Sequence, residues 1–198
     1  MEIIRKASLV PVPWKNGGGI THEMIRVPAT GDPFQWRVSI AQIDASGPFS
    51  NFTGYLRKMV LLRGAGLRLK FGAGPERLLH DIGDMTEFDG AIAPECELLD
   101  GPCTDLNLMV STSVTGVRVW VERLLEPRPL RPSFQGTVLA FAISGIVTIE
   151  LERREATRLQ AWDLAVMSPG ERGSIGPAGL DAAAAPLVFF AALDDNSP

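Results

Sequence analysis

Glycine and proline interrupt this sequence at short intervals, and this spacing constrains the fold more than any other feature. The 198 residues include 20 glycines and 15 prolines. They recur roughly every ten residues, and the segments between them are short, a pattern typical of β-strands joined by turns. The sequence therefore predicts an all-β protein.

Two of these segments alternate between apolar and polar residues, as strands with two different faces do. Residues 36–43 place Trp36 on an apolar face and both Arg37 and Ser39 on the opposite one. Residues 105–110 also have a polar face, which consists of Asp105, Asn107 and Met109. Such a face is either ordinary surface or the wall of a wet cavity in a small barrel, and alternation alone leaves both interpretations open.

A second run of strand-like segments begins near residue 114 and follows a similar order. Its segments are residues 117–122, 138–143, 145–151, 161–167 and 187–193. Two such runs predict two β-barrel-like halves, residues 1–115 and 116–198. Within the second run, the proline-rich residues 126–132 are expected to form an extended surface connection.

Composition and charge argue against several functions. A formal charge of -4 and a pI of about 5.2 disfavour a nucleic-acid partner held by a basic surface. No segment looks like a signal peptide or approaches the roughly 20 apolar residues of a membrane span. Cys96 and Cys103 are too few for a disulfide scaffold, so we expect two reduced thiols in a cytoplasmic protein without a membrane partner.

Residues 11–25 contain an unusual segment, with a tryptophan, a Lys-Asn pair and three successive glycines. Three glycines are costly in chain entropy and are favoured where the backbone needs unusual φ/ψ angles or approaches another group closely. The segment is therefore either a tight turn between two strands or a loop that approaches a ligand. It is not a Walker loop, because Lys15 precedes the glycines and a strand-like run follows them.

Catalytic and metal-binding patterns are scarce in this sequence. The chain has two histidines, His22 and His80, and a Ser-His-Asp triad would need one of them. The cupin metal signature is absent; it has two histidines separated by one residue, a following glutamate and a later histidine. We therefore expect neither a metal nor another cofactor.

Several polar residues occupy positions at which they do not look like surface. We expect them to line one wet pocket, with Trp14 and Trp36 as its apolar walls. These residues are Lys15, Asn16, Thr21, Glu23, Arg37, Ser39, Arg57, Asp105 and Asn107. A pocket with a few convergent polar groups is the usual form of a small-molecule site.

Five motifs in the first half of the chain together resemble the HutD/Ves family. They are residues 14–19 with Thr21 and Glu23, then residues 36–41, 47–50, 54–57 and 105–109. They occur in order and at the family's spacing, whereas the second half is similar only to a generic cupin-like half. One departure is Thr53, where the family usually has proline before Gly54.

The resemblance implies an all-β bicupin, with two cupin-like β-barrel or jelly-roll halves in one compact chain and no metal. It also implies a cytoplasmic role in histidine utilisation. Family members look like small-molecule sensors that bind urocanate or N-formylglutamate and limit flux through the pathway. Members of the Ves branch lie outside that pathway, so the identity of the ligand is left open. Whether the protein forms a homodimer is also left open.

The resemblance also assigns roles to the pocket residues. Arg57 and Lys15 would face a ligand carboxylate, because a guanidinium offers a two-pronged donor. Glu23 and Asp105 would orient these cations. The remaining predicted ligand-binding residues are Asn16, Ser39 and Asn107 as neutral hydrogen-bonding groups, Gly17 and Gly18 through their backbone N–H groups, and Met109.

Three functions are consistent with this pattern. The first is a non-catalytic regulator that binds a small carboxylate. The second is a metal-free cupin enzyme, an isomerase or a hydrolase-like protein, with Glu23, Asp105 or His22 as general base. The third is a structural protein whose pocket is vestigial. The shortage of histidine and the lack of a nucleophile–base pair favour the regulator over the enzyme.

Overall fold

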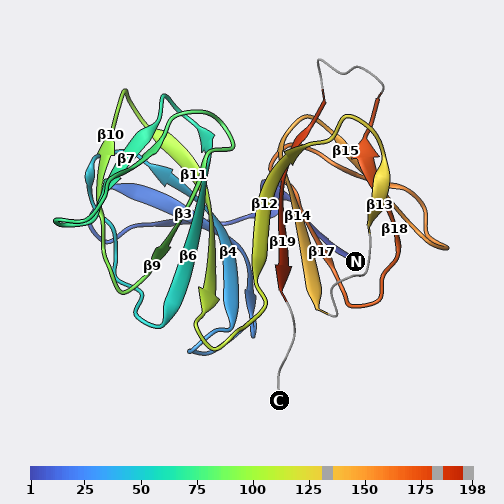
Figure 1. The fold of residues 1–198 in the computed structure, drawn as a ribbon, viewed down its shortest axis with the longest axis horizontal. Coiled ribbons are helices and arrows are strands. Elements are labelled where there is room, and N and C mark those ends of the chain that lie inside the picture. Colours follow the sequence, from blue (N-terminus) through green and yellow to red (C-terminus); the bar gives the residue numbers. More distant parts are fainter. Residues whose placement is uncertain (131–135, 180–184, 194–198) are drawn as a thin grey trace. The chain divides into compact units, whose positions relative to one another are not determined.

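The computed structural model describes residues 1–130, 136–179 and 185–193 (Figure 1). These residues form β-strands and one short 3-10 helix, η1 (Lys6–Ser8), and they contain no α-helix. The all-β fold predicted from the spacing of glycine and proline is therefore confirmed. In the described part of the chain, no helix has the length and apolar character needed to cross a membrane.

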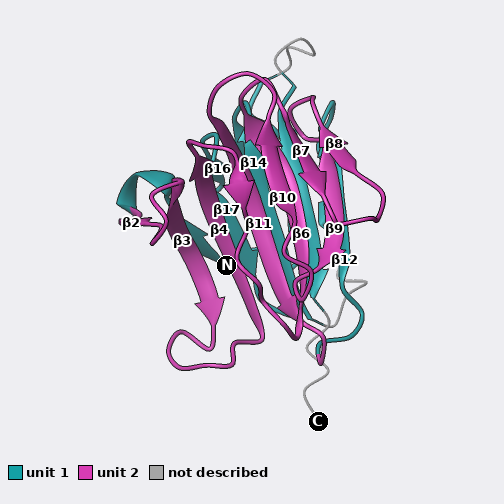
Figure 2. Cartoon of the chain, turned by 90° about the vertical axis from the view of Figure 1, so that its left-hand side faces the viewer, with its two compact units in different colours: residues 1–8, 114–198 teal, residues 9–113 magenta. Residues whose placement is uncertain are grey.

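The strands belong to two compact units, which we call unit 1 and unit 2 (Figure 2). Unit 2 spans residues 9–113, and unit 1 combines residues 1–8 with residues 114–198. The division at residue 115 expected from the sequence placed the N-terminal residues in the first half. They belong to unit 1 because β1 (Glu2–Ile4) pairs antiparallel with β17 (Leu164–Met167), a partner about 160 residues away in the chain.

Unit 2 contains two antiparallel sheets. The larger has the order β2-β3-β4-β11-β6-β9, with β2 (Pro11–Pro13), β3 (Gly19–Val27), β4 (Trp36–Ile43), β11 (Cys103–Ser111), β6 (Tyr55–Arg63) and β9 (Met85–Asp89). The smaller has the order β5-β10-β7-β8, with β5 (Gly47–Pro48), β10 (Glu95–Leu98), β7 (Leu67–Lys70) and β8 (Arg77–Leu79).

Unit 1 also contains two antiparallel sheets. The first has the order β1-β17-β14-β19-β12, with β14 (Thr137–Ser144), β19 (Leu187–Leu193) and β12 (Arg118–Arg123). The second has the order β13-β18-β15-β16, with β13 (Arg128–Leu130), β18 (Gly173–Pro177), β15 (Val147–Leu151) and β16 (Thr157–Leu159).

Strand β13 corrects the expectation of a plain connection at residues 126–132. Arg128, Pro129 and Leu130 pair with β18, and β13 lies at the edge of its sheet. An edge strand tolerates proline, because the missing backbone N–H is not needed by a neighbour on the open side. Residues 131–132 lie outside the described part of the chain.

In the interior of unit 2, the buried side chains change from apolar to polar along the strands of the larger sheet. Ile43, Met59 and Leu61 belong to an apolar core cluster. On the same face of the sheet, since side chains alternate with a period of two, lie Arg37 on β4 and Arg57 on β6. Both arginines pair in register with Met109 of β11. The buried face of this sheet therefore runs from apolar side chains to polar ones, and the polar end forms the candidate site.

Candidate ligand-binding pocket

The polar end of the sheet borders a cavity of about 640 Å³ that lies within unit 2. Strands β2, β3, β4, β5, β6 and β11 contribute to its wall, together with the loops at residues 14–16 and 49–52. The cavity brings together most of the predicted site residues, namely Trp14, Lys15, Asn16, Thr21, Glu23, Arg37, Ser39, Arg57, Asp105, Asn107 and Met109.

Trp36 does not line this cavity. Its side chain is buried, but it lies on the face of β4 opposite Arg37, because neighbouring residues of a strand point to opposite sides. Trp36 therefore cannot be an apolar wall of the site, and this expectation is wrong.

Gly17 and Gly18 are also absent from the cavity wall, because they form the turn between β2 and β3. Gly17 has a φ of 72°, and the N–H of Gly18 donates to Asn16 Oδ1 at 3.1 Å. A Cβ at Gly19 would lie 2.2 Å from the carbonyl oxygen of Gln42, so the close approach is to β4 and not to a ligand. The three glycines therefore support the interpretation of this segment as a tight turn between two strands.

The polar face of β11 is buried, and the interpretation as ordinary surface is wrong. Ser39, Asp105 and Asn107 are 3%, 1% and 4% exposed. Asn107 pairs in register with Ser39 on β4 and with Met59 on β6, so paired strands flank it on both sides. These polar groups are removed from bulk water, and all three line the cavity.

Arg57 is a buried cation, only 6% exposed. Its Nη1 reaches the carbonyl oxygen of Ser50 at 3.5 Å, and its buried Nε has no hydrogen-bond partner within the described residues. The guanidinium carbon lies 5.3, 5.5 and 5.0 Å from the ring centres of three phenylalanines, which are Phe49, Phe52 and Phe88. Burial lowers the pKa of Arg57 to about 10, so the side chain is still charged at neutral pH.

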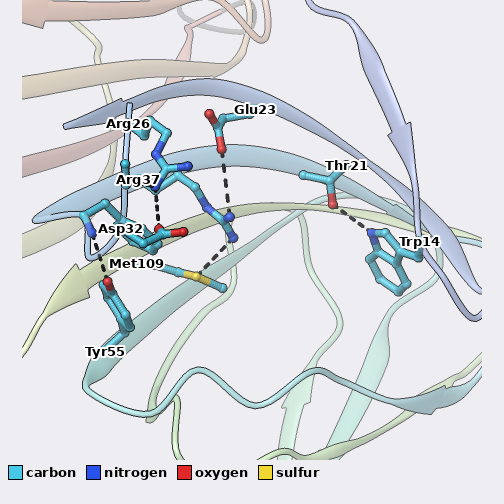
Figure 3. A network of polar contacts seen from close by, with 10 residues as sticks. Trp14, Thr21, Glu23, Arg26, Asp32, Arg37, Tyr55 and Met109 are labelled. Atoms are coloured by element: carbon cyan, nitrogen blue, oxygen red, sulfur yellow. Dashed lines mark hydrogen bonds and ion pairs between the residues drawn. The ribbon is translucent and has the colours of Figure 1, made fainter. Parts of the chain in front are cut away.

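Arg37 is the second guanidinium of the cavity (Figure 3). Its Nη1 lies 3.9 Å from Glu23 Oε2, and its Nη2 lies 3.2 Å from the sulfur of Met109. Its guanidinium carbon lies 5.4 Å from the centre of the Phe52 ring, which Arg57 also contacts. Burial lowers the pKa of Arg37, and the nearby Glu23 opposes this shift. Glu23 thus lies where it orients a cation, as the family resemblance implied, but the cation is Arg37.

Asp105 and Asn107 form a buried hydrogen-bonded pair in the same cavity. Asn107 Nδ2 donates to Asp105 Oδ2 over a long 3.4 Å. Burial raises the pKa of Asp105 to about 7, and the charge of Arg57 and the Asn107 hydrogen bond partly offset this effect. Asn107 Oδ1 is buried and accepts no hydrogen bond from the described residues.

Aromatic residues in the loop after β5 are functional-site candidates that the sequence analysis missed. Phe49 and Phe52 line the cavity and contact Arg57, and the ring of Phe49 packs edge-on against Trp14 at 6.2 Å. Trp14 in turn donates from Nε1 to Thr21 Oγ1 at 2.7 Å (Figure 3). The available signal was two phenylalanines in a loop otherwise rich in turn residues, since such rings must pack on something. The other wall residues not predicted are Val12, Pro13, Ala41, Pro48 and Ser50.

The histidines contribute little to the cavity. His22 does not line it, because it lies on β3 between Thr21 and Glu23, which face the cavity. His80 is exposed, with Nδ1 at 3.1 Å from Asp81 Oδ1. Within residues 1–130, 136–179 and 185–193, no cluster of three or more His, Cys, Asp or Glu side chains is arranged to hold a metal ion.

Comparisons with known proteins place the chain in a family. Residues 6–183 match the family described as HutD. The chain belongs to the HutD family. It is 38% identical, over 82% of its length and 84% of the relative, to a 21.2 kDa protein from the hutC 3' region of Pseudomonas putida. It is also 30% identical to protein Ves of Escherichia fergusonii, over 67% of this chain and 68% of that protein. The resemblance to HutD and Ves is therefore confirmed.

Several solved structures share this fold. A conserved protein of unknown function from Pseudomonas aeruginosa PAO1 superposes with a TM-score of 0.86 at 30% identity, over 98% of each chain. HutD from Pseudomonas fluorescens SBW25 gives 0.78 at 28% identity, over 97% of this chain and 98% of that one. Oxalate decarboxylase from Bacillus subtilis gives 0.66 at 10% identity, covering 100% of this chain and 78% of that one, which shows a cupin-like fold and nothing further.

Proposed function

We propose that this HutD-family protein is a non-catalytic regulator linked to histidine utilisation, which binds a small carboxylate such as N-formylglutamate or urocanate in the cavity of unit 2. Two relatives support the link to this pathway, because one is named for the hutC 3' region and the other is named HutD. We further propose a cytoplasmic, metal-free bicupin, in which unit 1 and unit 2, each with two antiparallel sheets, are the two cupin-like halves.

The buried charge of Arg57 is the observation that carries this proposal. A guanidinium removed from water is expensive unless an anion or several acceptors satisfy it. Here the protein supplies one long contact to Ser50, three aromatic rings and the nearby charge of Asp105, which favours the charged form of Arg57. No carboxylate of the described residues lies within ion-pair distance of Arg57. A ligand carboxylate would accept two parallel hydrogen bonds from this fork and would compensate the charge.

The charge balance of the cavity also favours an anion. Lys15, Arg37 and Arg57 are its cations, and Glu23 and Asp105 are its acidic residues. Glu23 lies beside Arg37, and the raised pKa of Asp105, about 7, leaves that group partly protonated at neutral pH. The wall is therefore net positive when the ligand arrives, and it attracts a carboxylate.

A metal-free enzyme is the second candidate, and Asp105 is the observation that favours it. A buried carboxyl whose pKa lies near 7 is suited to general acid–base catalysis. The experiment that separates the two candidates incubates purified protein with N-formylglutamate or urocanate and follows the compound by NMR. Unchanged spectra over many hours with saturating ligand support the regulator, and conversion that Asp105→Asn abolishes supports the enzyme.

Calorimetric titration with N-formylglutamate and urocanate tests the binding proposal directly. We expect Arg57→Ala to weaken binding by about 2–4 kcal/mol, which is roughly 30- to 1,000-fold, and Arg57→Lys to lose affinity as well, because an ammonium cannot form the fork. Arg63→Ala is the matched control, since Arg63 is exposed at the end of the same strand. A large loss of apo stability with unchanged affinity in Arg57→Ala would make Arg57 a structural residue and remove the basis of the proposal.

A further inference from the structure

Three arginines lie in one cross-strand row on the same face of the larger sheet of unit 2. Arg26 on β3 pairs in register with Arg37 on β4, and Arg37 pairs with Met109 on β11 (Figure 3). Met109 pairs in turn with Arg57 on β6. Like charges placed side by side across a sheet repel each other and weaken the pairing. Such a row therefore requires groups that separate or compensate its charges.

The ring of Phe52 lies against both guanidiniums that line the cavity. Its centre is 5.4 Å from the guanidinium carbon of Arg37 and 5.5 Å from that of Arg57. Strand β11 lies between β4 and β6, so the backbones that carry the two arginines are about 10 Å apart, a gap that accommodates one ring. The face of an aromatic ring is electronegative and attracts a guanidinium. Phe52 therefore offsets part of the repulsion between these two charges.

Aromatic rings make up much of the surroundings of both cations. The Nε atoms of Arg37 and Arg57 are buried, and neither has a hydrogen-bond partner among the described residues. A second ring, that of Phe34, lies 5.3 Å from the guanidinium carbon of Arg37. Burial lowers the pKa of Arg57, Asp105 opposes this change, and the charge of Arg37 adds to it. The two guanidiniums thus act on each other electrostatically, and the ring of Phe52 is the group that contacts both.

The loop that carries Phe52 is fixed by hydrogen bonds of its backbone. The N–H of Phe52 donates to the carbonyl oxygen of Gly90 at 2.7 Å, and its own carbonyl oxygen accepts from the N–H of Tyr55 at 3.2 Å. Beside it, Asn51 Nδ2 donates to the carbonyl oxygen of Ala91 at 2.7 Å. The ring therefore has a defined place, although the residue is only half-buried.

We infer that Phe52 is a positioning residue, whose ring holds Arg37 and Arg57 as the two neighbouring cations of one anion site. This inference rests on the proposed function, because the anion is assigned to the cavity. It goes further in two respects: Arg37 contributes to the affinity for the anion beside Arg57, and one apolar side chain controls both. Of these two arginines, Phe49 contacts Arg57 and Phe34 contacts Arg37, so these rings provide matched controls.

NMR relaxation of the arginine Nε atoms tests the positioning in the apo protein. In Phe52→Leu, which keeps an apolar side chain and removes the ring, the order parameters of both Arg37 and Arg57 should fall. Phe49→Leu should lower the value of Arg57 more than that of Arg37, and Phe34→Leu should do the reverse. Phe52→Tyr, which retains the ring, should restore both values. A general loss of packing would not produce this pattern.

Calorimetric titration with N-formylglutamate tests the effect on affinity. Phe52→Leu should weaken binding roughly 5- to 20-fold, the range expected when the ring contacts of two buried cations are lost. Phe52→Tyr should recover most of this loss. Arg37→Gln should also weaken binding, and in that background Phe52→Leu should have a smaller effect than in the wild-type protein, because the two residues act together.

Three results would overturn the inference. Unchanged order parameters of both arginines in Phe52→Leu would show that the ring does not position them. Unchanged affinity in Phe52→Leu or in Arg37→Gln, with binding abolished by Arg57→Ala, would refute the inference and leave the carboxylate site at Arg57 intact. If neither N-formylglutamate nor urocanate binds the wild-type protein, the proposed function fails together with the role in affinity, and the order parameters alone decide whether Phe52 holds the arginines.

Discussion

In unit 1, Val188 and Phe190 on β19 pack into an apolar core cluster, whereas in unit 2 the buried face of β11 carries Asp105 and Asn107. Both strands lie between two partners in an antiparallel sheet. The sheet architecture is thus the same in kind, and the side chains on one face differ. Apolar side chains close an interior by packing, but buried polar ones require partners and leave room for a molecule that supplies them.

Two aspartates that are buried in the described part of the chain show the same contrast. Asp163 in unit 1 is 4% exposed and accepts hydrogen bonds from Arg5 Nη1, the Lys6 N–H and the Gln160 N–H at 2.6, 3.0 and 3.0 Å. Asp105 in unit 2 accepts one long side-chain hydrogen bond, from Asn107. Asp163 therefore fixes the N-terminal segment to unit 1, while Asp105 is left for the chemistry of the cavity.

The largest expected loss of stability comes from truncating a large side chain in the core of unit 1. Phe190 is 1% exposed and stacks on Trp120 with ring centres 5.1 Å apart. Phe190→Ala should lower the free energy of unfolding in urea by about 3–5 kcal/mol, because it leaves a cavity in a packed interior. Phe52→Ala, at the half-buried wall of the existing cavity, should cost less than about 2 kcal/mol. Equal losses would show that the two interiors are packed alike.

The next effect is a dependence of stability on pH that originates in unit 2. The pKa of Asp105 is about 7 in the folded protein, against 3.8 for an ordinary aspartate. Between these values the folded state holds a proton that the unfolded state releases, so stability falls as pH rises from about 4 to 7 and levels off above. The upper limit of this loss is about 4 kcal/mol.

Urea titrations of the apo protein at several pH values measure this dependence. Asp105→Asn should remove it, because the amide does not titrate, while Asp163→Asn in unit 1 serves as the comparison. An unchanged slope between pH 4 and 7 in Asp105→Asn would contradict the assignment to this group.

A smaller loss of stability is expected when alanine replaces a glycine that lies against a backbone carbonyl oxygen, a contact found in both units. A Cβ at Gly19 would lie 2.2 Å from the Gln42 carbonyl oxygen, and one at Gly173 would lie 1.9 Å from that of Glu150. Gly19→Ala and Gly173→Ala should each destabilise the protein by about 2 kcal/mol, since backbone must shift. Gly18→Ala is the control for the first, because its nearest neighbour is the Asn16 side chain at 3.4 Å, and its thermal melting should barely change.

The last prediction concerns the rate at which the two cysteines are labelled, which reports on unit 2 alone and requires no substitution. Cys96 and Cys103 are the two cysteines of the chain, and both are buried, free thiols in unit 2. Burial raises the pKa of Cys96 to about 12, so the reactive thiolate is scarce. A chromogenic disulfide reagent should therefore label the native protein slowly. In urea, where the protein is unfolded, the same reagent should label both cysteines. A bound carboxylate should slow the native reaction further, and fast native labelling would contradict the buried placement.

The sequence by itself determined the class of fold and much of the cavity wall. Frequent turn residues and period-two alternation are local properties of the chain, so they predicted an all-β protein before any contact was known. Alternation also placed Arg37 and Ser39 on one face, and Asp105 and Asn107 on one face, because the strand geometry alone fixes that relation.

Only the tertiary structure decided which face is buried, what lies opposite, and which distant segments pair. Alternation could not distinguish surface from cavity at Asp105, since both give the same pattern. It could not reveal the phenylalanine rings around Arg57, the use of the glycines in a turn, or the pairing of β1 with β17. These features depend on contacts between residues far apart in the chain, which the folded packing of the sheets creates and no local pattern encodes.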